Sequence, residues 1–513
     1  MKKTITKLSV VAFLGLTIFI ACKTQEKTEA SSYLPINVLP SCVVTPSEFK
    51  TWFVGGNPTE NGAVEPANSV TFGHADNCDF YRWSEQMFLW ITSPSSGIYG
   101  QSKTVFESPV FFTVSPEFGA NERKLIPHKP GVLLNALPSL EKSIGVDSEE
   151  GQATGDALMS KDGALLYYIT MVNDVYAQFI AAVNAGKMKG KQFPTTQAEL
   201  NTIIAYAKTQ NIVLPDAKAL AIELKTSWVD ASTVKDLSKY ITIDALVPTY
   251  IKTSKKWTII PNKTQKIKLA LLGVHIVGST AGHPEMVWST FEHKNNAPNL
   301  SYTYLDTAMK QQKIAADTKG LWVLNSAPAD TTNINISHMK FKNDTISAKW
   351  KLKNTSPPPP NNTISPSNTT RTKPWGVTNK GVPNPENATA AASNSQIISI
   401  NNSVLSQLVG NDIRKNYLFI GSTWTDGGAA PNGQSYSATN TTSGVAIGTS
   451  QLANSTMETY DQSTAYNPNG SCFSCHHDYK SPTPTLDPNF LSHVYADIRR
   501  GDSISGKKVK LIQ

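Results

Sequence analysis

A Cys-x-x-Cys-His motif at Cys472 to His476 constrains what this 513-residue chain can fold into more than any other feature. Two thiols at this spacing can add to the vinyl groups of one haem, and the adjacent imidazole then reaches the iron as the proximal ligand. The pattern also occurs in redox dithiols, in half of a zinc site and by chance. A redox dithiol lies near a βαβ pattern and a zinc site needs two further ligands, and the sequence shows neither. We therefore expect one covalent haem c on Cys472, Cys475 and His476.

The N-terminus has the layout of a bacterial export signal. Three lysines within the first seven residues precede an apolar run over residues 8–21, which is short for a membrane span. The run closes on Phe19, Ile20, Ala21 and Cys22, an ending that resembles a lipobox, in which the cysteine is acylated. Phe19 stands where a lipobox usually has leucine, so ordinary signal cleavage is the alternative.

These features predict an exported protein. We expect residues 1–21 to be removed as a signal peptide, Cys22 to carry the lipid, and residues 23–32 to form a polar tether. The mature protein would then be an outer-membrane lipoprotein that faces the periplasm or the cell surface. Without acylation of Cys22 it would be a soluble periplasmic protein.

Export also bears on the two remaining cysteines. With Cys22 assigned to lipid and Cys472 and Cys475 to haem, Cys42 and Cys78 are left over. Unpaired thiols are disfavoured in an oxidising compartment, so we expect these two to form a disulfide. Sequence does not show that they are close together, and two buried free thiols are the alternative.

Composition and charge are those of an ordinary globular protein. Apolar residues make up 40% of the chain and charged residues 17%, which excludes disordered and fibrous classes. The net charge of +8 is spread thinly, and Lys507, Lys508 and Lys510 are the most basic cluster. Nucleic-acid binding needs a concentrated basic stripe, so no nucleic-acid partner is expected. The expected partners are a membrane surface, through the lipid anchor, and a redox protein of unknown identity.

The hydrophobic patterns predict an α+β fold in several parts. Residues 22–80 are rich in Pro, Gly and Asn, which is typical of a tether and an irregular lead-in. A β-rich α+β domain is predicted over 81–354, with a helical insertion at about 160–245. Four consecutive prolines mark a Pro/Asn-rich linker over 355–395. We expect residues 396–513 to form a mostly irregular and helical region that bears the haem.

Spacing and composition predict the individual elements. Trp83, Met87 and Trp90 recur at helical spacing before Pro94. Further helices are expected over 173–187, 195–210 and 216–229, which form the insertion, and over 452–460 and 487–500. Strands are expected over 104–114, 267–277, 286–292 and 417–424, with a loop at 278–284 and a hairpin over 339–352.

The second axial ligand of the haem is the open question of the sequence. Small cytochromes c usually have a methionine downstream of the motif, but no methionine follows His476. Met457 shares a predicted helical face with Ala453 and Tyr460, so it is one candidate. His493 is another, although it projects off the apolar face of its predicted helix. Another histidine or an open site completes the alternatives.

A polar cluster between residues 275 and 298 could have a chemical role. His275, Glu292 and His293 lie on or beside predicted strands, where they could line a cavity and supply acid and base groups. The alternative is a polar edge whose histidines are satisfied within the core.

Several segments beyond the haem motif resemble one family. The order and content of these segments are similar to those of large, exported bacterial proteins of the cytochrome c family: Trp83 to Pro94, ELKTSWV at 223–229, His275 to Pro298 with TFEHKNNAP, KNYLFIGSTW at 415–424, LANSTMETYDQ at 452–462, and SCFSCH at 471–476. The resemblance implies export and a single haem on Cys472, Cys475 and His476, but no particular reaction. We expect an electron-transfer cytochrome, and the alternative is a haem enzyme with an open distal site acting on peroxide, oxygen or a small molecule.

Overall fold

A computed structural model describes most of the chain. The described residues are 34–95, 103–115, 123–129, 131–136, 156–328, 334–342, 344–348, 363–376, 388–437, 440–462 and 471–498. Contacts divide the chain into Met1–Asn37 and Val38–Gln513, and the helices and strands of the described residues belong to the second unit. The expected signal peptide, Cys22, the tether and the lysines at 507–510 lie outside the described residues.

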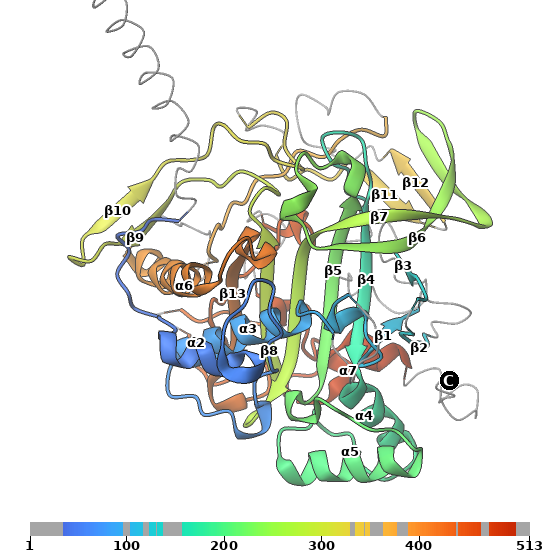
Figure 1. Ribbon diagram of the computed structural model, residues 1–513, viewed down its shortest axis with the longest axis vertical. Coiled ribbons are helices and arrows are strands. Elements are labelled where there is room, and N and C mark those ends of the chain that lie inside the picture. The colour runs from blue at the N-terminus through green and yellow to red at the C-terminus, as the bar shows by residue number, and fades with distance from the viewer. Residues whose placement is uncertain are drawn as a thin grey trace, which may run out of the picture. The chain divides into compact units, whose positions relative to one another are not determined.

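A large, almost entirely antiparallel sheet organises the second unit, which has an α+β fold (Figure 1). The main path runs in the order β14-β13-β8-β7-β5-β4-β1-β2. In that order the strands are Ala446–Gly448, Tyr417–Thr425, His283–His293, Lys256–Thr280, Ile222–Asp230, Leu166–Asn173, Phe111–Val114 and Leu125–Pro127. Segments from before and after the expected linker at 355–395 are therefore neighbours in one sheet, because β13 pairs with β8.

Strand β5 occupies a central position that the sequence assigns to a helix. The predicted helix over 216–229 is wrong, because only the single 3-10 turn η5 (Ala217–Ala219) precedes β5. The expected helical insertion therefore contains strands β4, β5 and the start of β6 as well as two helices. Leu220, Leu224 and Trp228 mimic helical spacing, and this spacing hides the alternation of Glu223, Lys225 and Ser227, although β5 is a strand covered on both faces.

A side branch of the sheet forms a long hairpin. Strand β6 (Thr242–Lys252) pairs with the first part of β7, and their tip projects beyond the neighbouring strands in Figure 1. Short strands β3 (Leu134–Asn135), β11 (Met339–Lys342) and β12 (Thr345–Ala348) complete this branch. The predicted hairpin over 339–352 is confirmed by the β11–β12 pair, while the predicted loop at 278–284 shrinks to a tight turn between β7 and β8.

Helices α2 (Pro46–Trp52), α3 (Asn77–Ile91) and α6 (Ala388–Gln407) lie on one side of the unit, with α3 packed on the sheet. Phe88 of α3 stacks on Phe291 of β8 with ring centroids 4.3 Å apart, and Ser84 Oγ lies 2.7 Å from Ser289 Oγ. Cys42 and Cys78 form a disulfide, with Cα atoms 5.4 Å apart, that ties the lead-in to the first turn of α3. The lead-in is therefore more regular than its composition indicates.

The opposite face is covered by α4 (Asp174–Asn184), α5 (Gln197–Thr209) and the C-terminal segment. Figure 1 shows this segment, in red, behind the strands that α3 covers in front. Helix α7 is only Pro488–Leu491, and residues 493–498 are helical again after a break at Ser492, so the single helix expected over 487–500 is interrupted. The helix expected over 452–460 is wrong, because this stretch consists of turns and of η10 (Thr459–Asp461).

The linker expected at 355–395 does not separate two domains. Its described part, residues 363–376, includes Arg371 and Trp375, which are 2% and 1% exposed, and α6 already begins at Ala388. Together with the pairing of β13 and β8, this burial makes Val38–Gln513 one unit. A separate two-stranded sheet is formed by β9 (Tyr302–Leu305) and β10 (Gln311–Ile314), beside α6.

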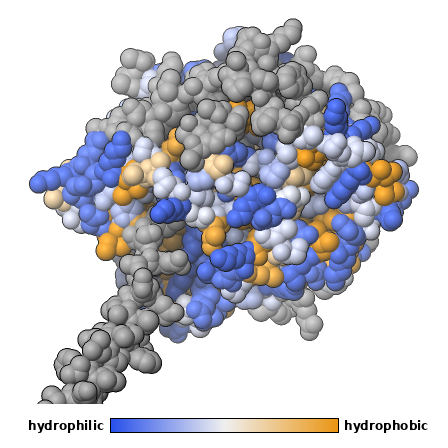
Figure 2. Space-filling view, turned by 90° about the horizontal axis from the view of Figure 1, so that it is seen from above, coloured by the Kyte–Doolittle hydropathy of each residue, from blue (hydrophilic) through white to orange (hydrophobic). Residues whose placement is uncertain are grey.

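The visible surface is mixed. Figure 2 shows mostly hydrophilic residues on one face of the molecule, with hydrophobic residues in small, separate patches. Among the described residues, no helix combines the length and the apolar character that crossing a bilayer requires.

Candidate functional site

The Cys-x-x-Cys-His motif forms one tight turn on the face opposite α3. Helix η11 (Cys472–Ser474) begins after Ser471, whose hydroxyl accepts the Phe473 amide at 3.1 Å. The amides of Cys475 and His476 both donate to the carbonyl of Cys472, at 3.2 and 3.1 Å. Cys472 and Cys475 are both thiols of intermediate exposure. The turn therefore brings two partly accessible thiols and one imidazole together, as haem attachment requires.

Phe473 anchors this turn in the core. Its side chain is fully buried in a large hydrophobic cluster that also contains Tyr176 of α4 and Trp288 of β8. The rings of Phe473 and Trp288 meet edge to face, 5.9 Å apart, and Cys472 packs against the same cluster. Because Phe473, the second residue of the motif, points into the core, the rest of the turn lies at the edge of the cluster.

His476 is held in one tautomer. Its Nδ1 lies 3.0 Å from the carbonyl oxygen of Leu491, and a carbonyl can only accept, so the neutral ring carries its proton on Nδ1. The Nε2 atom is then the one with a lone pair. The ring is 5% exposed and packs against Trp288, with centroids 4.2 Å apart. Orientation of a histidine by a hydrogen bond from its other nitrogen is the usual arrangement for a metal ligand.

Neither proposed distal ligand faces His476 across a gap. His493 stacks on His476, with centroids 4.6 Å apart and planes 24° apart, whereas two axial ligands of one haem lie on opposite sides of the iron. Met457 is fully buried in a different cluster, with Leu166, Val229 and other residues of the sheet. The described contacts therefore do not bring Met457 to the haem motif.

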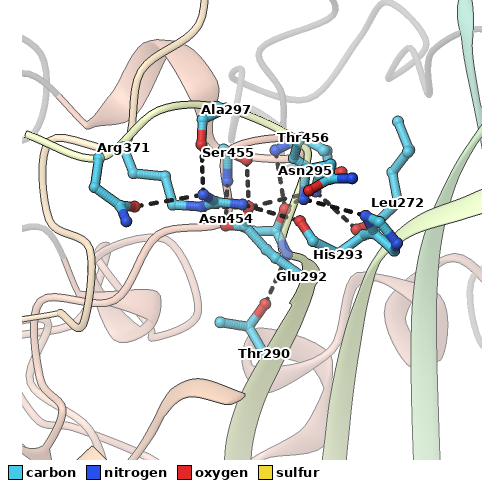
Figure 3. Close-up of polar contacts among 12 residues, drawn as sticks. Leu272, Thr290, Glu292, His293, Asn295, Ala297, Arg371, Asn454, Ser455 and Thr456 are labelled. Carbon is cyan, nitrogen blue, oxygen red and sulfur yellow. Dashed lines mark hydrogen bonds and ion pairs between the residues drawn. The ribbon is translucent and has the colours of Figure 1, made fainter. Parts of the chain in front are cut away.

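Glu292 and His293 belong to a buried structural network, drawn in Figure 3. Arg371 donates through Nε to Glu292 at 2.8 Å, and through its Nη atoms to the carbonyls of Ala297 and His293. The Ser455 amide donates to the other oxygen of Glu292 at 2.7 Å, and the Ser455 hydroxyl also donates to Glu292. Glu292 thus clamps the segment that leads to the haem motif onto β8.

His293 is equally enclosed. Its Nε2 lies 3.1 Å from the carbonyl of Lys239, its ring stacks on Tyr240, and burial lowers its pKa to about 3. Glu292 and His293 are both fully buried and hydrogen-bonded. They therefore fit the alternative in which these polar residues are satisfied within the core. The TFEHKNNAP stretch is a structural junction among strand β8, residues 363–376 and the C-terminal segment.

His275 is different, because it joins a polar cluster near the haem motif. Its Nε2 lies 2.8 Å from Glu458 Oε1, and the two side chains retain 10% and 17% exposure. Although burial opposes it, the charge and hydrogen bond of His275 bring the pKa of Glu458 below its usual range. Burial, and after it the Glu458 charge, raises the pKa of Cys472.

Two residues of β5 extend this polar cluster. Lys225 lies opposite His275 in the β5–β7 register, and burial lowers its pKa to about 8. Burial also raises the pKa of Glu223 to about 7, and Glu223 accepts a hydrogen bond from Ser492 Oγ at 2.6 Å. The sequence missed Glu223, Lys225 and Glu458 as candidates. The alternation of Glu223, Lys225 and Ser227 was the available signal, and the predicted helix concealed it.

No family model, no curated protein and no solved structure matches this chain. Within the described ranges, no group of three or more His, Cys, Asp or Glu side chains is arranged to hold a metal ion. Function must therefore be inferred from the residues themselves.

Proposed function

We propose that the protein is an exported, monohaem c-type cytochrome that transfers electrons and is anchored to the membrane through a lipid on Cys22. The observation that carries this proposal is the hydrogen bond from His476 Nδ1 to the carbonyl of Leu491, at 3.0 Å, within one turn of two thiols. This bond leaves Nε2 with the lone pair that an iron ligand needs. The donor set of Cys472, Cys475 and His476 fits a covalent haem.

The chain's own residues have distinct tasks in this proposal. Cys472 and Cys475 would hold the porphyrin through thioether bonds, and His476 would be the proximal ligand. A bound haem supplies one-electron chemistry at its iron. The Leu491 carbonyl fixes the plane and basicity of the imidazole, while Trp288 and Phe473 exclude water from one side of it. The low polarity of Trp288 and Phe473 would favour the reduced state of a bound haem, because this state carries less charge than the oxidised state.

A second candidate function rests on the polar cluster of Glu223, Lys225, His275 and Glu458. These groups lie on the same face of the sheet as the motif, and the His275–Glu458 pair keeps partial access to solvent. Ionisable groups with shifted pKa values beside a cofactor are typical of acid-base sites. The alternative is therefore a haem enzyme with an open distal position, in which His275 or Lys225 donates protons to peroxide, oxygen or a small molecule.

Spectroscopy of the purified haem protein separates the two candidates. An electron-transfer cytochrome should be low-spin in both redox states and should not bind carbon monoxide. A high-spin reduced form that binds carbon monoxide would reject that reading and support the enzyme. If the protein is the haem enzyme, His275→Ala should change the rate of its reaction with peroxide. Met457→Leu should leave the haem absorption spectrum unchanged, because Met457 lies in a different cluster from the motif.

The lipid anchor needs its own test. Metabolic labelling with a fatty acid should label the wild-type protein, and Cys22→Ser should abolish the label and release the protein from membranes. A Cys22→Ser protein that stays membrane-bound would contradict anchoring through this residue.

A further inference from the structure

Two histidines far apart in the sequence meet on the face of the sheet that α3 covers. His74 precedes α3, His283 begins β8, and their Nε2 atoms lie 3.2 Å apart although 209 residues separate them. Both rings contact Phe80 of α3, at 5.1 and 4.9 Å between centroids. The tight turn before His283 depends on Gly282, whose φ of +76° lies in the left-handed region. This pair is remote from the motif, because Trp288 and His476 pack on the other face.

The hydrogen bonds of both rings determine which nitrogens carry protons. His283 Nδ1 lies 2.8 Å from Glu285 Oε1, and His74 Nδ1 lies 3.4 Å from the carbonyl of Phe72. Carboxylate and carbonyl oxygens can only accept, so both contacts favour a proton on Nδ1 of a neutral ring, and the shorter contact makes this preference stronger at His283 than at His74. Each Nε2 then presents a lone pair to the other. Two unprotonated Nε2 atoms at this distance need a shared cation, which is either a metal ion or a proton held in an N–H···N hydrogen bond.

Glu285 makes this arrangement rigid. The Glu285 side chain is fully buried, and its Oε1 also accepts the amide of Thr425 at 3.1 Å. His283 itself is 1% exposed. The carboxylate therefore fixes the plane of the His283 ring and directs Nε2 toward His74. A carboxylate–histidine pair of this kind is the usual support for a histidine that binds a metal ion.

We infer that His74 and His283 form a binding site for a divalent transition-metal ion such as Zn²⁺ or Cu²⁺. Two imidazoles on a tetrahedral ion, each about 2.0–2.1 Å from it, have nitrogens about 3.3 Å apart, close to the separation here. His74 is exposed and gives the ion a path from solvent. Since the described residues offer no third ligand, water fills the other positions, and the ion is exchangeable.

Calorimetric titration of the full-length haem protein with ZnCl₂ tests this inference. Wild-type protein should bind one equivalent, and His74→Ala should weaken binding at least tenfold without affecting the fold, because His74 is exposed. His338→Ala is the matched control, since His338 is half-buried and bonded through Nε2 to the carbonyl of Ser365. This variant should bind Zn²⁺ like the wild type.

X-ray absorption of the Zn²⁺-loaded protein gives an independent readout. The spectrum should show two imidazole ligands and further oxygen ligands, with one imidazole fewer in His74→Ala. Equal affinity in the wild type and His74→Ala would overturn the site. An absence of Zn²⁺ binding at neutral pH would also overturn it, and the two rings would then share a proton. The difference between the wild type and His74→Ala does not depend on whether Cys472 and Cys475 carry haem, because both proteins have the same thiols.

Discussion

The two histidine sites on opposite faces of the sheet use the same orienting device with different surroundings. At His476 a backbone carbonyl accepts the Nδ1 proton, and at His283 a buried carboxylate does so. His476 is 5% exposed and sits beside two thiols, whereas the partner of His283 is the exposed His74. The thiols allow a permanent, covalent cofactor, while the exposed partner and open positions suit an ion that exchanges with solvent.

The orientation of a histidine ring and the retention of a group that binds to it are separate properties. Each Nδ1 hydrogen bond selects a tautomer, and this selection does not depend on what binds at Nε2. Retention depends on the residues around the second nitrogen. A substitution that affects the site at His476 should therefore leave the site at His74 and His283 unchanged, and the reverse should also hold. Experiments can test this independence.

The largest effect is expected from removing both thiols. The Cys472→Ala/Cys475→Ala protein should lose all covalent haem, so that acid-acetone treatment extracts whatever haem remains, while its affinity for Zn²⁺ at His74 and His283 stays unchanged. Ser474→Ala is the matched control, because Ser474 lies inside the motif without a ligand role and should keep the haem. Covalent haem in the double variant would overturn the proposed attachment site.

Breaking the Glu292–Arg371 ion pair should have the next largest effect, which is a loss of folding stability. Both side chains are at most 3% exposed, so Arg371→Met leaves a buried carboxylate uncompensated and should lower the free energy of unfolding by about 3–5 kcal/mol. Urea denaturation measures this change. The Glu292→Met/Arg371→Met protein should be more stable than Arg371→Met alone. Lys268→Met, which breaks an exposed pair with Asp244, should cost less than about 1 kcal/mol.

Arg371→Met should also affect the two histidine sites differently. Glu292 holds Ser455 and so the segment before the haem motif, but it has no bond to His74 or His283 among the contacts described. In Arg371→Met, hydrogen exchange should rise around residues 452–462 and 471–476 before it rises around His283. Equal loss of protection at both sites would show that the two faces unfold together.

Removing the disulfide should affect the site at His74 and His283 and leave the site at His476 unchanged. Cys78 lies in the first turn of α3, close in sequence to His74, and the bridge closes a loop of sequence separation 36. Cys42→Ser/Cys78→Ser should lower the free energy of unfolding by about 2–4 kcal/mol and weaken Zn²⁺ binding, while the haem content stays unchanged. A phosphine reductant such as tris(2-carboxyethyl)phosphine, which lacks thiols to compete for Zn²⁺, should reproduce the Zn²⁺ effect in the wild type but have no further effect in the variant. Loss of haem in this variant would contradict the independence of the sites.

The features that the sequence predicted correctly are determined by residues close together in the chain. Helices α4 and α5 have their caps nearby, and the hairpin of β11 and β12 is local. The Cys42–Cys78 pair followed from elimination among five cysteines. Such features are determined by neighbours in the chain, which a sequence shows directly.

Features that depend on tertiary contact were not predictable in this way. The sequence predicts a helix at strand β5 because Leu220, Leu224 and Trp228 have helical spacing, and only the tertiary contacts on both faces show that the segment is a strand. The role of Glu292 requires Arg371, which lies 79 residues away, and the pairing of His74 with His283 spans 209 residues. The Pro/Asn-rich segment looked like a linker, yet Arg371 and Trp375 within it are buried, and composition cannot show such burial.

The smallest effect is expected from changing the groups that accept the Nδ1 protons of His283 and His476. Glu285→Gln keeps the size of the side chain but removes the charge that holds the Nδ1 proton of His283, so Zn²⁺ affinity should fall about 10–100-fold. Calorimetry measures the affinity, and the haem spectrum should not change. The equivalent acceptor for His476 is the Leu491 carbonyl, which no side-chain substitution removes, so Leu491→Ala should alter packing but keep the axial ligand. Unchanged Zn²⁺ affinity in Glu285→Gln would mean that packing against Phe80, and not the carboxylate, orients His283.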